Sequence, residues 1–330
     1  MNTASNWQKL LTFDPVPSLL DSENKTIVYF TQSDLLNESV PPFNSVWELP
    51  EAQKLLKKQQ SDGSWDKPGK AEIYPPWYSQ LVETFKRYRP LVERYQLTIE
   101  HPAINKAAEF LFSCQTDAGD IRGFIGNQYA TYYTGYVLAL LIRAGYPNDP
   151  RIEKGLQWLL SMRQDDGGWT VPILTHKYNR EAGYKLTSQN MEPVEPDRTK
   201  PFSHNWTDMV LRAFAAHPDY RKSKEAKSAG NLLKSTFFQP DVYTSYQAPR
   251  YWTRFAFWWP SLLTALESLY LLGFPPDDKD IKAGLQWFID NQKPDGLWKL
   301  ESHKEMSPKD WGERLWLSLS ICRLLKSYYA

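Results

Sequence analysis

Four segments of the chain end in the same short turn, and this repeat limits the folds that the sequence can form. The clearest copy is residues 284–298, where an apolar helical pattern is followed by Gln-Lys-Pro-Asp-Gly-Leu-Trp. Residues 155–169 and 52–65 repeat the pattern, and a fourth copy at 108–119 lacks the closing Trp. A glycine after a helix supplies the left-handed backbone conformation that ends it. Each copy therefore predicts a helix closed by a tight turn.

A second helix follows each turn, and its pattern differs from that of the first. The second helices are apolar nearly all round, as in residues 135–142 and 262–269, whereas the first helices carry Lys and Glu on one side. A helix that is apolar on most faces is buried on most faces. The pattern thus predicts a layer of half-exposed outer helices and a layer of inner helices at residues 77–88, 133–144, 206–216, 260–272 and 311–326.

Stacked hairpins of this kind bury a continuous core only by adding neighbours. We therefore predict an all-α fold, an α/α toroid of about five to six hairpins, over residues 47–330. Residues 1–46 form a preface of short helices that packs on the outside of the barrel and is able to pair with the last inner helix. Two long outer-to-inner loops, 170–203 and 240–256, should gather at the end where the inner helices begin and cover a central cavity.

Composition and charge exclude several classes of protein. The net charge of +1 provides no field to attract nucleic acid. The two cysteines, Cys114 and Cys322, form neither a disulfide framework nor a metal motif. The N-terminus lacks the pattern of a signal peptide. The uncharged run 123–142 could span a bilayer by length, but its Asn, Gln and Gly residues favour a loop and a buried helix. We expect a cytoplasmic protein, with peripheral membrane contact left open.

The Gln-x-x-Asp-Gly-x-Trp pattern at residues 59–65 and 292–298 resembles the QW motif of squalene–hopene and oxidosqualene cyclases. It is similar, more loosely, to the helical-hairpin toroid of the protein prenyltransferase β subunits. The resemblance covers residues 47–330, about the size of one of the two barrel domains of those cyclases. It implies a terpene-cyclase-like barrel whose central cavity takes a polyisoprenoid or similar apolar ligand. In the cyclases the motif links outer helices, so the resemblance bears on the fold more than on activity.

The acid motif of those cyclases, Asp-x-Asp-Asp at the start of an inner helix, has no full counterpart here. The corresponding stretch is residues 203–211, where Asp208 is the only carboxylate. A single Asp lacks the neighbouring carboxylate that helps to keep an acid protonated near neutral pH. The zinc ligands of the prenyltransferases also lack counterparts, so we predict no metal and no cofactor. Whether the chain is an enzyme stays open; an isomerase of this kind would need another acid.

Three titratable residues on predicted inner helices are candidate catalytic groups. Asp208 lies four residues before Arg212, so it either pairs with that residue or faces the cavity as an acid whose charge Arg212 controls. Glu267 lies between leucines in mid-helix, where an unpaired carboxylate is costly; it is paired, protonated or facing a wet cavity. His204, at a helix start, either caps the helix or acts with Asp208 as a general acid–base group.

Aromatic residues concentrate near the starts of the predicted inner helices, most densely in residues 251–260. They either pack in the core or line one cavity, where their faces would contact an isoprenoid chain, a carbocation or ammonium ion, or sugars. Arg254, with Arg250 and His176, could hold an anionic headgroup at helix N-termini. Glu313 should lie in the first turn of its helix, where the dipole favours it. The candidate ligand-binding residues are Trp206, Arg212, Tyr132, Tyr133, Tyr136, Arg254, Trp258, Trp259, Tyr270, Trp311 and Glu313.

Three functions remain open on the sequence alone. The first is a terpene-cyclase-like protein that binds or converts an isoprenoid in the central cavity. The second is a non-catalytic helical-repeat toroid whose rim binds protein partners. The third is a carbohydrate-active α/α barrel, which needs two carboxylates across the cavity at hydrolase separations.

Overall fold

The computed structural model describes residues 6–66, 75, 77–243, 248–255, 259–300 and 307–329. Their regular secondary structure is helical, with two isolated β-bridges and no named strand among these residues, which confirms the predicted all-α class. The helices are α1 Val16–Leu20, α2 Lys25–Phe30, α3 Pro50–Leu56, α4 Tyr78–Glu93, α5 Pro102–Ser113, α6 Thr131–Arg143, α7 Pro150–Ser161, α8 Arg180–Ser188, α9 His204–Ala216, α10 Lys224–Ser235, α11 Leu262–Leu271, α12 Lys279–Asp290 and α13 Pro308–Tyr329.

The chain forms two compact units. Unit 1 comprises Met1–Glu51, Lys234–Pro240 and Tyr246–Ala330, and unit 2 comprises Ala52–Leu233 and Asp241–Ser245. Unit 1 therefore joins the N-terminal helices to the C-terminal ones.

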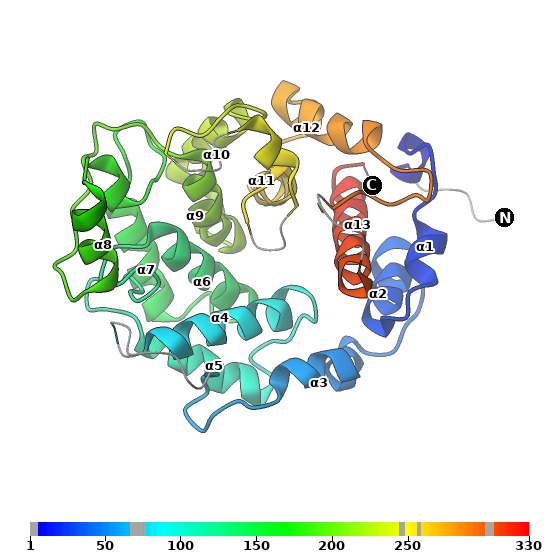
Figure 1. Ribbon diagram of the computed structural model, residues 1–330. Coiled ribbons are helices and arrows are strands. Elements are labelled where there is room, and N and C mark those ends of the chain that lie inside the picture. The colour runs from blue at the N-terminus through cyan, green and yellow to red at the C-terminus, as the bar shows by residue number, and fades with distance from the viewer. Residues whose placement is uncertain are drawn as a thin grey trace. The chain divides into compact units, whose positions relative to one another are not determined.

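Unit 2 is built of an inner and an outer layer of helices (Figure 1). In the inner layer α6 packs against α9 on one side and α4 on the other; α5 and α7 pack outside, against α4 and α6. Eleven residues of α6 are buried, whereas α7 buries one face. This is the predicted alternation of an α/α toroid: helices apolar all round lie inside, and amphipathic helices lie outside.

The inner helices α6 and α9 are parallel and very close. A Cβ atom added at Gly135 would lie 2.6 Å from the Cα of Val210, so only glycine allows this approach. The rings of Tyr132 and Trp206, near the starts of the two helices, lie 4.3 Å apart. The connections that precede α6 and α9 therefore lie together at one end of unit 2.

The insertion at 170–203 contains a helix that the sequence analysis did not predict. α8 begins after Asn179, whose side chain accepts the N–H of Ala182 at 2.8 Å. The buried amide of Gln128, before α6, holds the rest of the insertion by donating to the Glu192 carbonyl at 3.1 Å and accepting the Val194 N–H at 3.0 Å. The insertion also exposes four large apolar side chains, Leu174, Tyr178, Tyr184 and Met191.

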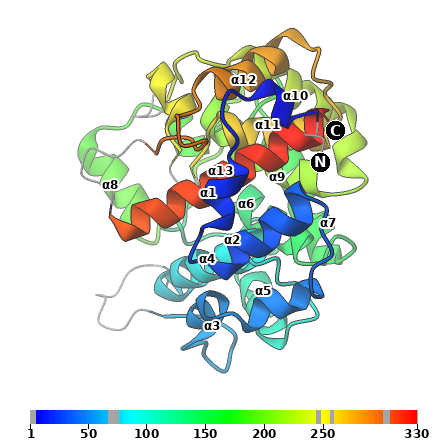
Figure 2. The same cartoon turned by 90° about the vertical axis from the view of Figure 1, so that its right-hand side faces the viewer.

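Unit 1 confirms the predicted pairing of the N-terminal segment with the last inner helix. α13 packs against α11 on one side and against α2 and the π-helical turn Thr31–Leu35 on the other (Figure 2). Arg323 on α13 forms an ion pair with Asp34 at 2.6 Å. The backbone carbonyl of Phe13, just before α1, accepts the side-chain amide of Gln292 at 2.7 Å.

Three of the four repeat turns bind a Gln side chain in the same way. The amide nitrogen of Gln115 donates to the carbonyl of Gly119 at 2.8 Å and to that of Arg151, at the start of the next outer helix, at 2.9 Å. Gln59 and Gln292 make the same pair of bonds, to Gly63 and Ala103 and to Gly296 and Phe13. The N-terminal segment of unit 1 thus takes the place of the next outer helix. In the repeat at 155–169 the equivalent position is Arg163, whose side chain donates to the Gly167 carbonyl at 2.9 Å, and the next residue, Gln164, binds the insertion at the carbonyls of Asp197 and Lys200.

The closing Trp residues complete the turns. Each indole N–H donates to a carbonyl at the end of the preceding helix: Trp65 to Lys57, Trp169 to Leu159 and Trp298 to Phe288. The backbone N–H of the closing residue donates to a buried hydroxyl on the following inner helix. The donor–acceptor pairs are Trp65–Thr84, Ile121–Thr134, Trp169–Thr207 and Trp298–Ser318. Ile121 replaces the missing Trp of the faint repeat, so all four turns are fastened to their inner helices.

The predicted position of Glu313 is wrong. α13 begins at Pro308, three residues before the predicted start, because Ser307 and Asp310 cap it: the N–H of Ser307 donates to the Asp310 carboxylate at 3.0 Å and that of Asp310 to the Ser307 hydroxyl at 3.2 Å. Asp310, not Glu313, is the acidic residue of the first turn.

Candidate functional site

Four aromatic side chains of unit 2 form a continuous row at the start of α6 and α9. The ring of Trp206 lies 4.3 Å from that of Tyr132, and Tyr132 lies 4.4 Å from Tyr133. Tyr133 stacks on Phe124, from the loop before α6, with centroids 3.8 Å apart and an interplanar angle of 11°. We call Trp206, Tyr132, Tyr133 and Phe124 the inner-helix aromatic cluster. The structure thus brings together three residues that the sequence analysis assigned to one cavity.

The cluster is apolar and uncharged at neutral pH. Trp206, Tyr132 and Phe124 are buried and Tyr133 is half-buried. Burial, and secondarily the nearby Tyr78, raise the pKa of Tyr133 to about 12. Burial likewise raises the pKa of Tyr132 well above its usual value. Both phenols therefore stay protonated, and their ring faces can contact an apolar chain or a cation.

A buried network of charges lies below the cluster, one turn further along the inner helices. Asp208 and Arg212 form an ion pair at 2.8 Å on α9. The Arg212 guanidinium lies over the Tyr136 ring, 4.6 Å from its centroid. The Tyr136 hydroxyl donates to the Glu93 carboxylate of α4 at 2.9 Å, and Glu93 also lies 3.6 Å from Arg89. The network joins α4, α6 and α9.

This geometry bears on two of the sequence alternatives. The structure places Asp208 beside Arg212, the pairing that the four-residue spacing allowed. Tyr136, assigned to the cavity with its tyrosine neighbours, instead lies in the charge network and is 2 % exposed. Burial and the Glu93 carboxylate raise the pKa of Tyr136.

The start of α9 is held by a carboxylate that the sequence analysis missed. Asp241, from the loop after α10, accepts the Ser203 hydroxyl at 2.7 Å and the Asn205 N–H at 3.1 Å. It also lies 3.6 Å from Nδ1 of His204. Burial lowers the pKa of His204 to about 4, against the opposing effect of Asp241. His204 is therefore neutral at pH 7, and Ser203, rather than His204, is the capping residue of α9.

In unit 1, Glu267 is half-buried on α11, within electrostatic range of Arg323 on α13. Burial lowers the pKa of Arg323, whereas Asp34 and Glu267 act in the opposite direction. Of the alternatives for Glu267, this arrangement matches a carboxylate with a cationic neighbour. Tyr270, one turn on, is 40 % exposed and packs its ring 5.1 Å from that of Tyr328.

Two other predicted ligand residues of unit 1, Arg254 and Trp311, form cation–π contacts with different partners. Arg254 lies over the Tyr251 ring at 5.4 Å. Trp311 is 41 % exposed and carries the Arg314 guanidinium over its ring at 5.4 Å. Trp259 is half-buried, and Trp258 lies outside the described residues.

Sequence reasoning also missed residues that contact the predicted site. Arg89 and Glu93, four residues apart on α4, were detectable as an ion pair of helical spacing. Phe124 and Asp241 lie in loops, where no periodic pattern marks an inward-facing side chain.

Neither a metal-binding cluster nor a membrane-spanning helix occurs among the described residues. No group of three or more His, Cys, Asp or Glu side chains in this part of the chain is placed to hold a metal ion. None of the helices described is both long and apolar enough to cross a bilayer.

Comparison with known proteins gives related sequences. Residues 83–190 match the family model for the squalene–hopene cyclase C-terminal domain. The chain is 28% identical over 196 residues to squalene–hopene cyclase from Alicyclobacillus acidocaldarius, a match that covers 58% of this chain and 27% of the cyclase. It is 29% identical over 128 residues to the Zymomonas mobilis squalene–hopene cyclase, covering 35% and 18%. The matches thus span less than a third of either relative's length.

Two solved structures are also similar to the chain. A protein from Actinoplanes is 17% identical, with 87% of each chain covered and a TM-score of 0.45. A variant of the type II terpene cyclase MstE from Scytonema, in complex with its substrate geranylgeranyl dihydroxybenzoate, is 14% identical, with 87% of this chain and 96% of that chain covered and a TM-score of 0.32.

Proposed function

Since the chain is a member of the squalene–hopene cyclase/prenyltransferase-like superfamily, we propose that its inner-helix aromatic cluster is part of a binding site for a polyisoprenoid or a similar apolar ligand. The observation that supports this proposal is the continuous row of four rings at the ends of two parallel inner helices, with centroid separations of 3.8 to 4.4 Å. Such a row offers a methyl-branched chain several aromatic faces in succession.

The proposal concerns ligand binding and assigns no catalytic step to the cluster. Asp208 is engaged by Arg212 at 2.8 Å and Asp241 accepts two donors at the start of α9. Both carboxylates are thus engaged by other groups, so the proposal assigns neither of them as the acid that protonates an alkene. His204, neutral at pH 7, is able to accept a proton. The proposal therefore assigns no acid to the cluster; Glu267, in unit 1, stays a separate candidate for a proton donor.

The test combines binding and product analysis. The purified protein is incubated with farnesol, geranylgeraniol or squalene in dilute detergent; protein-bound lipid is recovered by gel filtration and identified by mass spectrometry. We expect at least one isoprenoid to co-elute with the native chain. Tyr133→Leu and Trp206→Leu should weaken its retention about tenfold, a loss of roughly 1.4 kcal/mol that two lost aromatic contacts can supply.

The matched control is Tyr184→Ala, which removes an aromatic side chain that is 68 % exposed on α8. It should leave retention unchanged. Equal retention by Tyr133→Leu, Trp206→Leu and the native chain would refute the site. If a cyclised product appears, Glu267→Gln tests the remaining acid: an undiminished rate would remove Glu267 from the proposal while leaving the binding site in place.

A further inference from the structure

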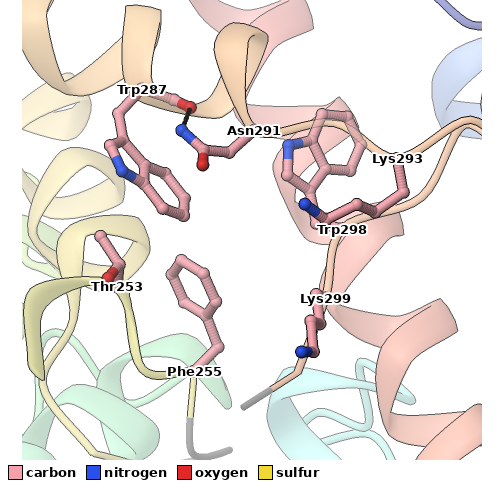
Figure 3. A pocket seen from close by; sticks show the side chains of 7 residues that line it. All are labelled: Thr253, Phe255, Trp287, Asn291, Lys293, Trp298 and Lys299. Atoms are coloured by element: carbon pink, nitrogen blue, oxygen red, sulfur yellow. Dashed lines mark hydrogen bonds between the residues drawn. The ribbon is translucent and has the colours of Figure 1, made fainter. Parts of the chain in front are cut away.

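A pocket of about 220 Å³ in unit 1 lies between the end of α12, the turn after it and residues 253–255. Figure 3 shows Trp287 and Phe255 on one side of the space and Trp298 on the other, with Asn291 between the two indoles. The rings are held in place. Phe255 and Trp287 lie 5.8 Å apart, and the Trp298 indole donates to the Phe288 carbonyl at 2.7 Å.

Two lysines add positive charge to this aromatic lining. Lys293 and Lys299 both line the pocket, on the side of Trp298 (Figure 3). The remaining lining residues are Thr253, Phe255, Trp287, Asn291 and Trp298, so none of the described lining residues is acidic. A ligand in the pocket meets the half-buried Trp287 ring and two lysine side chains, whereas Phe255 and Trp298 are 8 % and 1 % exposed.

We propose that this pocket binds a small aromatic anion, such as an aromatic carboxylate of one or two rings. A planar ring can lie against the half-buried Trp287 indole, where offset and edge contacts are favourable. Its negative group is then within reach of the lysine ammonium groups, which attract an anion and repel a cation. The volume is below the roughly 300–1,000 Å³ of sites for drug-sized ligands, which restricts the ligand to the size of a fragment.

The same chemistry sets the order of affinities. A neutral ring of the same shape loses the attraction of Lys293 and Lys299. A non-aromatic anion of similar size keeps that attraction but loses the contacts of a flat face with the Trp287 indole. The pocket shares no residue with the inner-helix aromatic cluster, so this proposal and the isoprenoid proposal stand or fall separately.

The experiment uses the full chain and 2-naphthoate as the probe, with binding measured by isothermal titration calorimetry at low ionic strength. We expect one site, with the dissociation constant raised at least fivefold in Lys293→Met and in Lys299→Met. Trp287→Leu should weaken binding by a similar factor. The neutral isostere 2-naphthamide and the non-planar cyclohexanecarboxylate should each bind at least fivefold more weakly than 2-naphthoate.

Lys282→Met is the matched control, because Lys282 is exposed on α12 and does not line the pocket. It should bind 2-naphthoate like the native chain. Circular dichroism melting of each variant shows that a loss of binding does not come from unfolding. The proposal is overturned if 2-naphthoate does not bind, if folded Lys293→Met and Lys299→Met retain native affinity, or if cyclohexanecarboxylate binds as tightly as 2-naphthoate.

Discussion

The hydroxyl of Thr207 on α9 binds both backbone groups of Trp169: it accepts the Trp169 N–H at 2.8 Å and donates to the Trp169 carbonyl at 3.1 Å. Thr207 is fully buried, so no water replaces these bonds. Thr84, Thr134 and Ser318 are also fully buried and accept the corresponding N–H in the other repeats. One hydroxyl on each of these four inner helices, α4, α6, α9 and α13, thus binds the turn of its own hairpin.

Thr207→Val should lower the free energy of unfolding by about 1–3 kcal/mol, because it keeps the shape of the side chain but leaves the buried Trp169 N–H unsatisfied. The Trp169 carbonyl keeps its bond from the Ser203 N–H at 3.0 Å. Thr207→Ser keeps the hydroxyl and should recover most of that loss. Urea denaturation of both variants measures the difference. Equal stability of the Val and Ser variants would mean that the hydrogen bonds do not stabilise the turn.

Gln115→Glu should destabilise the chain more than Gln115→Met. The amide nitrogen of Gln115 donates to two carbonyls, at 2.8 and 2.9 Å. A Glu carboxylate would place an oxygen acceptor against the two carbonyl oxygens of Gly119 and Arg151, whereas Met only removes the two hydrogen bonds. We expect a loss of about 1 kcal/mol for Met and about 2–3 kcal/mol for Glu at pH 7. The comparison is made by thermal and urea unfolding; a Glu variant as stable as the Met variant would contradict the assigned orientation of the amide.

Removal of either member of the Asp208–Arg212 pair should be far more costly than removal of both. Both side chains are nearly inaccessible to solvent, at 1 % and 4 % exposed. Arg212→Met leaves a buried carboxylate and should cost about 3–5 kcal/mol, whereas the double variant Asp208→Leu/Arg212→Met leaves no buried charge from the pair. A double-mutant cycle by urea denaturation measures the coupling. Additive losses would show that the two residues do not act together.

The stability of the chain should fall as the pH drops from 6.5 towards 4 because of His204. Its pKa in the folded chain is about 4, below the ordinary histidine value of 6.5. In this pH interval the unfolded chain therefore binds a proton that the folded chain does not. The effect at pH 4.5 is on the order of 2 kcal/mol. His204→Gln should remove that part of the pH dependence between pH 7.5 and 4.5, and His176→Gln, at an exposed position of the insertion, should not. If the free energy of unfolding of the native chain and of His204→Gln changed equally with pH, this account would be contradicted.

The repeats made the hairpins predictable from the sequence. Gln, Gly and Trp at fixed offsets specify a turn whose hydrogen bonds are local, and the contrast between all-apolar and amphipathic helices identified the inner layer. The Asp208–Arg212 pair followed from helical spacing in the same way. These features depend on residues near one another in the chain, where periodicity carries the information.

The rest depended on contacts that no local pattern encodes. Asp241 reaches the start of α9 from beyond α10, and Phe124 completes the aromatic cluster from a loop. α8 was missed because its apolar side chains are few and Tyr184 is exposed, so no buried stripe marked it as a helix. The role of Gly135 was not assigned either, because the approach of Val210 joins helices far apart in the sequence.

Gly135→Ala should therefore destabilise unit 2 although alanine is the better helix former. A Cβ at this position lies 2.6 Å from the Cα of Val210, a backbone atom that can move only if α6 and α9 separate. The strain should cost about 1–3 kcal/mol, more than the gain of roughly 1 kcal/mol from helix propensity. Gly183→Ala on α8 is the matched control: a Cβ there meets nothing within 4 Å, so this variant should be neutral or up to about 1 kcal/mol more stable. Separation of the helices should also move Tyr132 away from Trp206, so Gly135→Ala, unlike Gly183→Ala, should weaken isoprenoid retention. If both variants have the same urea unfolding midpoint as the native chain, the close approach of the two helices is not a constraint on the fold.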